Sequence, residues 1–330
     1  MITSFVPTRR AALAAAGLSA ATAMVSGPAS TPAVAATAGA LPEIRYKTVK
    51  AKGLNIFYRE AGPTDAPVLL LLHGFPSSSH MFRDLIPRLA DSYRVIAPDY
   101  PGFGRSEAPT LAKFPYTFDA IARVVDAFTV AVGATSYVIY MQDYGGPVGF
   151  RLALEHPERV RGIIVQNAVI NVEGWNPEAV KAFAPFWQKR SAETERPVRT
   201  LLKAETTRFQ YTHGATRAER LSPDAWVHDQ AGLDRPGNDA LQLQMLWNYQ
   251  DNVAQYPTWQ EFLKSSQMPL LIAWGDNDPY FTLKGAELFK TLVPSAERFH
   301  FDAGHFALET HVDEIAEVSR AFLARLPLAR

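Results

Sequence analysis

Short, largely apolar segments recur along this chain and constrain its fold more than any other feature. A strand that is apolar at every position must be covered on both faces, as in a parallel sheet. Residues 68–72 form such a run, and similar short runs recur at residues 94–97, 137–140, 162–165, 270–274 and 298–301. Helical patterns separate most of them, for example at residues 81–89, 118–132 and 148–154. The alternation therefore predicts an α/β fold, with a mostly parallel central sheet flanked by helices.

The alternation of strands and helices is interrupted between residues 171 and 265. This stretch has no buried-strand pattern, is rich in Trp, Phe and Tyr, and contains helical patterns. It is predicted to form a helical cap lobe inserted into a core made of residues 41–170 and 266–330. Ligands of open α/β sheets bind at the carboxyl ends of the strands. A lobe that leaves from the carboxyl end of a strand would cover such a site.

The first 40 residues predict an export signal of the twin-arginine type. Arg9 and Arg10 precede a stretch of mostly Ala with Leu, Met and Val, and small residues follow at positions 33–38. We therefore exclude residues 1–40 from the fold and expect a periplasmic or secreted protein. The stretch is too weakly hydrophobic for stable membrane insertion after the signal is removed. A disordered Ala-rich leader is the alternative.

The composition argues against several classes of function. The chain has 33 Lys and Arg against 33 Asp and Glu, and it has no basic run, which argues against a nucleic-acid partner. Because it has no Cys, disulfides, cysteine catalysis and thiolate metal sites are excluded. Zinc-protease, P-loop and dinucleotide-binding motifs are also missing, so we expect neither a metal nor a cofactor.

Residues 141–146, Met-Gln-Asp-Tyr-Gly-Gly, follow a predicted strand and precede a predicted helix. A strand, a sharp turn with glycines and a helix form the context of a nucleophile elbow, in which the central residue is commonly Ser. Here the central residue is Asp143. A carboxylate is already charged at neutral pH, so it can displace a leaving group from a saturated carbon and form an alkyl ester. No Gly-x-Ser-x-Gly motif exists elsewhere, which disfavours an ordinary serine esterase.

Two further ionisable residues, Asp278 and His305, follow predicted strands later in the chain. Together with Asp143 they stand in the order nucleophile, acid and base that is typical of an α/β-hydrolase triad. His305 would deprotonate the water that attacks the ester, and Asp278 would orient the imidazole. Asp276 is the alternative acid. Each residue alone could be structural, but the three in this order favour catalysis.

The oxyanion hole of such a site uses two backbone N–H groups. One belongs to the residue after the nucleophile and the other to the loop after an early strand. In this chain these are Tyr144 and Phe75, the latter within His-Gly-Phe-Pro at residues 73–76. Each donor that points at developing negative charge is worth about 3–4 kcal/mol.

Four motifs together resemble the epoxide hydrolase and haloalkane dehalogenase branch of the α/β-hydrolase superfamily. They are residues 73–76, 99–106, 141–146 and 302–306. The resemblance covers nearly the whole chain after the leader and is weakest in the lobe. It implies an enzyme with the α/β-hydrolase fold that acts on a small apolar molecule, either an epoxide or a haloalkane.

The motifs divide between the two reactions. Phe75 is typical of epoxide hydrolases, and Tyr144 stands where dehalogenases carry a Trp that donates its indole N–H to the halide. The other residues around Asp143 and His305 resemble one dehalogenase subgroup. Asn167 stands where another subgroup has its catalytic acid, and because Asn cannot serve as that anion, the acid is expected at Asp278.

In epoxide hydrolases two tyrosines of the lobe activate the ring oxygen. Tyr249 matches the second of them, whereas Arg208 stands at the place of the first and Tyr211 is a shifted substitute. Simple packing is the alternative role for both tyrosines. The leading prediction is epoxide hydrolysis to a vicinal diol, and haloalkane dehalogenation is the first alternative. Ester or C–C bond hydrolysis with Asp143 as a base, and a non-catalytic binder, are further alternatives.

Overall fold

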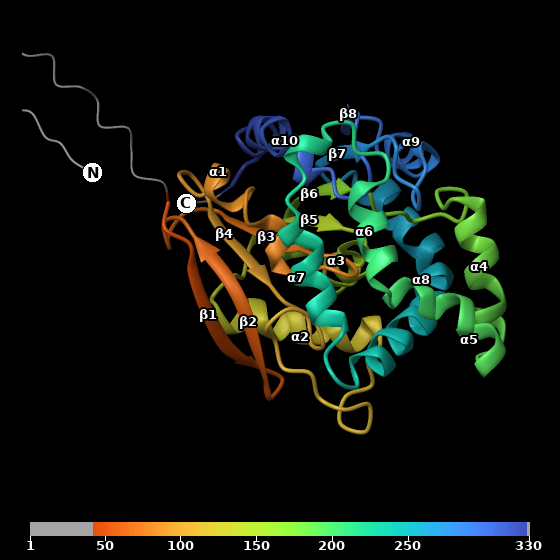
Figure 1. Cartoon of the computed structure of the whole chain (residues 1–330). Coiled ribbons are helices and arrows are strands. Elements are labelled where there is room, and N and C mark those ends of the chain that lie inside the picture. Colours follow the sequence, from red (N-terminus) through yellow and green to blue (C-terminus); the bar gives the residue numbers. More distant parts are fainter. Residues whose placement is uncertain (1–41, 329–330) are drawn as a thin grey trace, which may run out of the picture. The chain divides into compact units, whose positions relative to one another are not determined.

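The computed structural model describes residues 42–328. These residues form an eight-stranded sheet with helices around it (Figure 1). The strands lie in the order β1-β2-β4-β3-β5-β6-β7-β8. Their bounds are β1 (Arg45–Ala51), β2 (Leu54–Ala61), β3 (Val68–Leu72), β4 (Arg94–Pro98), β5 (Tyr137–Gln142), β6 (Val160–Gln166), β7 (Leu270–Gly275) and β8 (Glu297–Phe301). From β4 to β8 all pairs are parallel, whereas β2 pairs with β1 and β4 in antiparallel orientation. The prediction of a mostly parallel sheet is confirmed.

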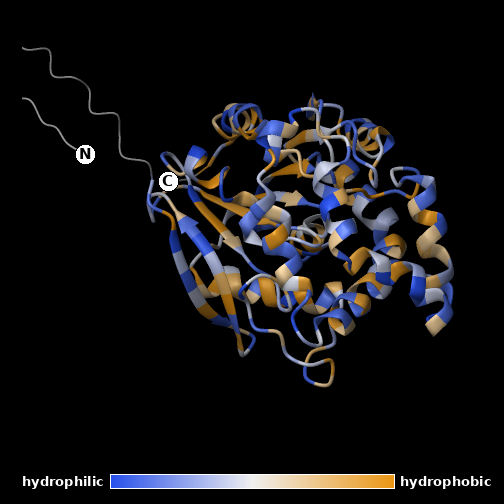
Figure 2. Ribbon diagram, viewed as in Figure 1, coloured by the Kyte–Doolittle hydropathy of each residue, from blue (hydrophilic) through white to orange (hydrophobic). Residues whose placement is uncertain are grey.

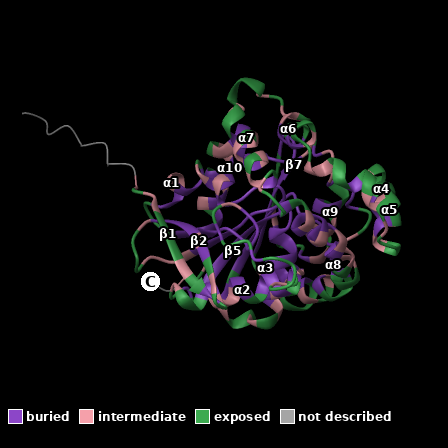
Figure 3. Ribbon diagram, turned by 60° about the horizontal axis from the view of Figure 1, so that its bottom comes forward, coloured by how far each residue is buried: buried purple, intermediate pink, exposed green. Residues whose placement is uncertain are grey.

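Helices cover both faces of this sheet, which explains why its central strands are apolar throughout. All six residues of β5 are buried, and the central strands form the buried centre of Figure 3, whereas the edge strands β1 and β8 are largely exposed. Successive residues of a strand point to opposite faces, so Leu70 and Ile139 belong to one core cluster while Leu71 and Tyr140 belong to the other. In Figure 2 the same strands are hydrophobic, and the helices around them carry both hydrophobic and hydrophilic residues.

Five helices of the core pack on the two faces. The first face carries α2 (Phe118–Ala131), α3 (Gly145–Glu155) and α9 (Leu283–Leu292). The second face carries α1 (Ile86–Leu89) and α10 (Leu308–Leu323).

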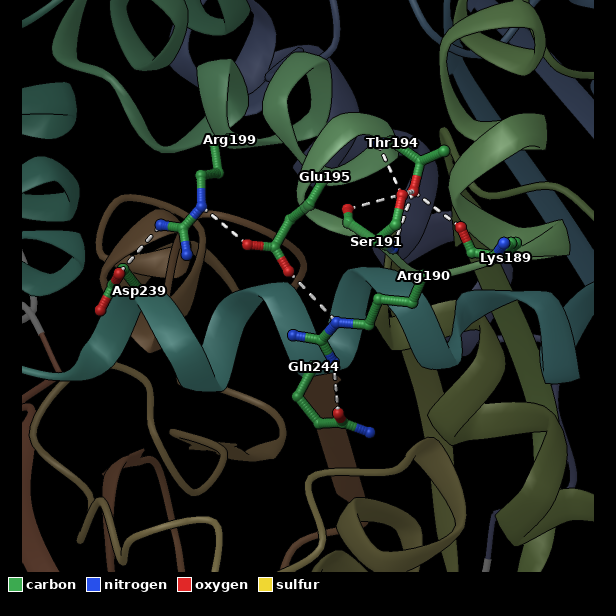
Figure 4. A network of polar contacts seen from close by, with 8 residues as sticks. All are labelled: Lys189, Arg190, Ser191, Thr194, Glu195, Arg199, Asp239 and Gln244. Carbon is green, nitrogen blue, oxygen red and sulfur yellow. Dashed lines mark hydrogen bonds and ion pairs between the residues drawn. The ribbon is translucent and has the colours of Figure 1, made fainter.

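The stretch between β6 and β7 is helical. It holds α4 (Pro177–Gln188), α5 (Ala192–Val198), α6 (Ala204–Thr212), α7 (Pro223–Leu233) and α8 (Asn238–Ser266), and we call these five helices the cap. In Figures 1 and 3, α4 and α5 lie farthest from the sheet. A capping box of Ser191 and Thr194 begins α5, and the ion pair of Arg199 with Asp239 links its end to α8 (Figure 4).

Two observations on the described part of the chain bear on its surroundings. None of its helices combines the length and the apolar character that a membrane span requires. Within residues 42–328 there is also no group of three or more His, Asp or Glu side chains that could hold a metal ion. The predicted export signal, residues 1–40, lies outside the described residues.

Candidate active site

Asp143 occupies a sharp turn between β5, which ends at Gln142, and α3, which begins at Gly145. Its φ of +50° lies in the left-handed region, which a non-glycine residue rarely adopts. A Cβ on Gly145 would overlap the carbonyl oxygen of Leu72, so the helix can begin this close to β3 only with glycine. The turn therefore has the geometry of a nucleophile elbow and places Asp143 at the carboxyl end of the sheet.

Two backbone N–H groups point at the Asp143 carboxylate. The N–H of Phe75 donates to Oδ1 at 2.7 Å, and the N–H of Tyr144 is near enough to help lower the pKa of the carboxyl group. A Cβ on Gly74 would overlap the Asp143 side chain, so the loop after β3 approaches the carboxylate closely. The two donors predicted for an oxyanion hole thus meet at one carboxylate.

His305 and Asp278 form a buried pair, with His305 Nδ1 2.8 Å from Asp278 Oδ2. The alternative acid, Asp276, instead lies 2.7 Å from Nδ1 of His300, and both of these side chains are about one-third exposed. The geometry therefore favours Asp278 over Asp276 as the partner of His305.

Asn167 holds Asp278 in place from the end of β6. Its Nδ2 donates to Asp278 Oδ2 at 2.8 Å, and its Oδ1 accepts from the N–H of Gly275 at 2.8 Å. Its backbone oxygen also accepts from the N–H of Asp143 at 3.2 Å. Sequence reasoning identified Asn167 only as a missing acid, because contacts between three separate strand ends leave no local pattern.

Gln142, the residue before Asp143, contacts the other side of the imidazole. Its Nε2 lies 2.9 Å from Nε2 of His305, and its Oε1 is buried without a hydrogen-bond partner. His305 is therefore held at both ring nitrogens. Sequence reasoning missed this contact, since a Gln at the end of a buried strand has many packing roles.

The charges of the three candidates depend on one another. Burial raises the pKa of Asp143, although His305 and the two N–H donors oppose this rise. Burial alone would lower the pKa of His305, but the charge of Asp278, its hydrogen bond and the charge of Asp143 raise it overall. The imidazole is thus stabilised as a cation by two carboxylates.

Asp143 and His305 line a cavity beneath the cap. It encloses about 460 Å³ of atom-free space, open solvent at its mouth included. Its apolar lining includes Trp175, Phe183, Trp187, Leu201, Leu246 and Phe281. Such a mostly apolar pocket with a few convergent polar groups is typical of a small-molecule site.

The predicted cap tyrosines occupy different places. Tyr249 lines the cavity, and its buried hydroxyl lies near that of Tyr256 without a well-formed hydrogen bond. Tyr211 does not line the cavity, because its hydroxyl donates to Asp229 and its ring stacks on Phe306. Its position thus speaks against Tyr211 as a substrate-activating group.

Of three other polar positions, two line the cavity and one does not. Arg208 is exposed, so it does not replace the missing tyrosine. Gln210 lines the cavity with its Nε2 buried and unpartnered, and the half-buried Tyr280 lines it from the core. Sequence reasoning missed Gln210 because it could not tell which face of α6 is turned inward, and it missed Tyr280 because a loop residue after a strand carries no periodic pattern.

The indole groups of the cavity are already engaged. Nε1 of Trp175 donates to the hydroxyl of Tyr256 at 2.9 Å, and Nε1 of Trp187 donates to the backbone oxygen of Leu246 at 3.0 Å. Neither of the two tryptophans that line the cavity therefore has a free N–H for a halide.

Comparisons with known proteins agree with this architecture. The model of the alpha/beta hydrolase fold family matches residues 67–312. An uncharacterized hydrolase of Saccharomyces cerevisiae, YNR064C, is 40% identical over 270 residues, which cover 80% of this chain and 92% of that protein. A haloalkane dehalogenase of Mycobacterium marinum is 30% identical over 281 residues, covering 80% of this chain and 87% of that protein.

Solved structures share the fold at lower identity. The crystal structure of wild-type DBJA matches with a TM-score of 0.71 and 24% identity, covering 84% of this chain and 97% of that one. The epoxide hydrolase CorEH matches with a TM-score of 0.68 and 19% identity, covering 86% and 99%. The family match and the two relatives above show that the chain belongs to the alpha/beta hydrolase fold family and is related to haloalkane dehalogenases, and the solved structures share its fold.

Proposed function

We propose that this enzyme hydrolyses an epoxide to a vicinal diol through a covalent alkyl ester on Asp143. The observation that carries the proposal is the unpaired, buried hydroxyl of Tyr249 in the same cavity as Asp143 and His305. An epoxide oxygen leaves as an alkoxide and needs a proton donor, which a phenol supplies. Burial raises the pKa of Tyr249 well above 10, so the phenol keeps its proton until the ring opens.

In the first step, Oδ2 of Asp143 attacks a ring carbon while Oδ1 stays bound to the N–H of Phe75. The carbon–oxygen bond of the ring breaks, and its electron pair goes to the ring oxygen, which takes the proton of Tyr249. The product is a hydroxyalkyl ester of Asp143, and the phenolate of Tyr249 regains a proton from water.

In the second step, Nε2 of His305 takes a proton from water, and the resulting hydroxide attacks the carbonyl carbon of the ester. The N–H groups of Phe75 and Tyr144 stabilise the charge on Oδ1. The bond between the carbonyl carbon and Oδ2 then breaks, and the leaving alkoxide takes the proton from Nε2 of His305. The diol leaves with Oδ2, and the oxygen of the water stays in the carboxylate of Asp143. Because alkylation neutralises Asp143, it removes one charge that raises the pKa of His305, which favours the neutral base when it is needed.

Haloalkane dehalogenation is the second candidate, since the relative from Mycobacterium marinum is named a haloalkane dehalogenase. It would form the same kind of ester, with a halide as the leaving group. Against it, Tyr144 replaces the adjacent Trp of dehalogenases, and the indole N–H groups of Trp175 and Trp187 are engaged elsewhere.

A trapping experiment tests the covalent mechanism. His305→Gln should alkylate at Asp143 but fail to hydrolyse the ester, so intact-protein mass spectrometry with a panel of epoxides should show a stable adduct. Asp143→Asn is the control and should show none. Absence of any adduct across epoxides and bromoalkanes would contradict the covalent mechanism, and bromide release without diol formation would favour the second candidate.

We also propose that the protein is exported by the twin-arginine route, as Arg9, Arg10 and the weakly apolar stretch after them suggest. Replacing both arginines with Lys should retain the full-length chain in the cytoplasmic fraction. Export of that variant at the original level would contradict the proposal.

A further inference from the structure

One face of α6 carries three buried side chains, and all three are polar. Thr207, Gln210 and Tyr211 have the spacing of neighbours on one side of a helix. Oγ1 of Thr207 donates to Gln230 at 2.6 Å, and the hydroxyl of Tyr211 donates to Asp229. Gln210 differs from them, because its Nε2 is buried without a partner.

Gln210 is 3% exposed and lines the cavity above Asp143. Burying an amide without a hydrogen bond costs free energy, and an apolar side chain of similar size, such as Met, would avoid that cost. In this position the missing partner can come from a molecule bound in the cavity. That molecule must carry a hydrogen-bond acceptor, because the unpaired group is an N–H donor.

The acceptor can be assigned from the other polar groups of the cavity. Asp143 attacks carbon, and Tyr249 is the buried phenol that protonates the leaving oxygen. We propose that Gln210 is the second donor to that oxygen, in the place where Arg208 and Tyr211 fail to supply one; this inference rests on the function proposed above. An amide does not release its proton, so Tyr249 protonates the oxygen while Gln210 orients it and stabilises its developing charge.

Tyr280 is the rival for this role, because it also lines the cavity. Its side chain is half-buried and belongs to the loop between β7 and α9, where its ring lies 5.7 Å from that of His305. The Tyr280 hydroxyl is not among the buried polar atoms that lack a partner, so Tyr280 does not need a ligand to satisfy its donor. The N–H group of Gln210, in contrast, is buried without a partner and needs a ligand to satisfy it.

The test uses Gln210→Met, which keeps the length of the side chain and removes the donor. In a single turnover with an epoxide, formation of the Asp143 ester should slow about 10- to 100-fold. Hydrolysis of that ester should change less than about threefold, since His305 and the N–H donors are untouched. The melting temperature should stay the same or rise, because the unpaired amide is gone.

Two matched variants distinguish Gln210 from its neighbours. Tyr211→Phe removes a hydroxyl from the same buried face outside the cavity, and it should leave ester formation unchanged. Tyr280→Phe removes the rival donor inside the cavity, and it should slow ester formation less than Gln210→Met does. An unaltered rate of ester formation in Gln210→Met, or a loss confined to Tyr280→Phe, would overturn the inference.

A binding measurement separates this inference from the proposed function. Pentanamide carries a carbonyl acceptor and does not alkylate Asp143, so its affinity can be titrated even if no epoxide reacts. Gln210→Met should bind it about tenfold more weakly than the wild type, as expected for one lost hydrogen bond. Equal affinity of the two proteins would overturn the role of Gln210, whereas failure of all epoxides to react would overturn only the proposed reaction.

Discussion

The core and the cap of this protein place their polar groups in different ways. In the core, Asp143, Asp278 and His305 follow predicted strands. Backbone N–H groups donate to the two carboxylates, and the side chains of Gln142 and Asp278 contact the imidazole. In the cap, the inner face of α6 is polar, and each buried side chain depends on a separate partner or lacks one. The comparison suggests that the core determines how the reaction proceeds, while cap side chains determine which molecule reacts.

The ion pairs of the two regions show the same contrast. In the core, Arg83 contacts both oxygens of Glu309, at 2.9 and 2.6 Å, and the Glu309 side chain is 3% exposed. In the cap, Arg199 contacts Glu195 and Asp239 (Figure 4), but Arg199 is 47% and Asp239 51% exposed. Exposed pairs are screened by solvent and contribute little to stability.

The largest effect is expected for Asp278→Asn, which tests the core directly. The neutral amide cannot stabilise the imidazolium of His305, so ester hydrolysis should slow about 10³- to 10⁴-fold. Ester formation should remain within about tenfold, since the nucleophile is intact. Rapid-quench kinetics can separate the two steps. Asp276→Asn is the matched control, and a comparable loss in that variant would contradict the assignment of Asp278.

A pair of Gly→Ala variants compares the backbones of the two regions. Gly145→Ala in the core forces a Cβ into the carbonyl of Leu72 and should lower the free energy of unfolding by about 2–4 kcal/mol. Gly232→Ala lies within α7 of the cap and meets open space, so it should raise that free energy by about 0.5–1 kcal/mol. Chemical denaturation measures both. If the two variants lowered the free energy of unfolding equally, the contrast between the core and cap backbones would be wrong.

The pH dependence of ester hydrolysis should have an acid limb. Only neutral His305 can accept a proton from water, and its pKa in the free enzyme is raised by Asp278 and Asp143 against the effect of burial. Below the pKa that His305 has in the ester intermediate, the rate should therefore fall about tenfold per pH unit, and above that pKa it should level off. Because the pKa of Tyr249 lies well above 10, ester formation should show no loss up to about pH 9. Single-turnover rates of ester formation and of ester hydrolysis, measured across this pH range, check both expectations.

Gln142→Met should move this acid limb. The N–H of Gln142 stabilises the neutral imidazole, so its removal should raise the pKa of His305 and shift the limb to higher pH. A shift of about 0.5–1 unit corresponds to a neutral hydrogen bond of about 0.5–1.5 kcal/mol. A shift to lower pH would instead show that Oε1 of Gln142 accepts from a protonated His305.

The smallest effect is expected for Arg199→Ala on the outside of the cap. The loss of its two exposed ion pairs should change the free energy of unfolding by at most about 0.5 kcal/mol. Arg83→Ala in the core should cost about 3 kcal/mol or more, because it leaves Glu309 buried without its partner. Thermal and chemical unfolding of both variants can be compared directly, and a large effect of Arg199→Ala would contradict the contrast between the regions.

Sequence reasoning was most accurate where local pattern and chemistry coincide. The buried apolar strands predicted the parallel sheet, and the glycines after Asp143 predicted the tight turn into α3. The order of Asp143, Asp278 and His305 predicted which strand ends would meet. These features depend on strand periodicity, backbone conformation and the topology of a parallel sheet, and each of these produces a recognisable pattern of residues in the sequence.

The contacts that orient those groups came only from the tertiary structure. Asn167 and Gln142 act on residues more than 100 positions away. In the cap, Tyr211 was expected in the cavity, yet the neighbouring Gln210 lies there instead, since adjacent helical residues point in directions about 100° apart. The sequence by itself determined the sheet, the elbow and the order of the reacting groups. Only packing decided which face of α6 meets the substrate, because polar residues on both its faces leave no hydrophobic stripe to orient it.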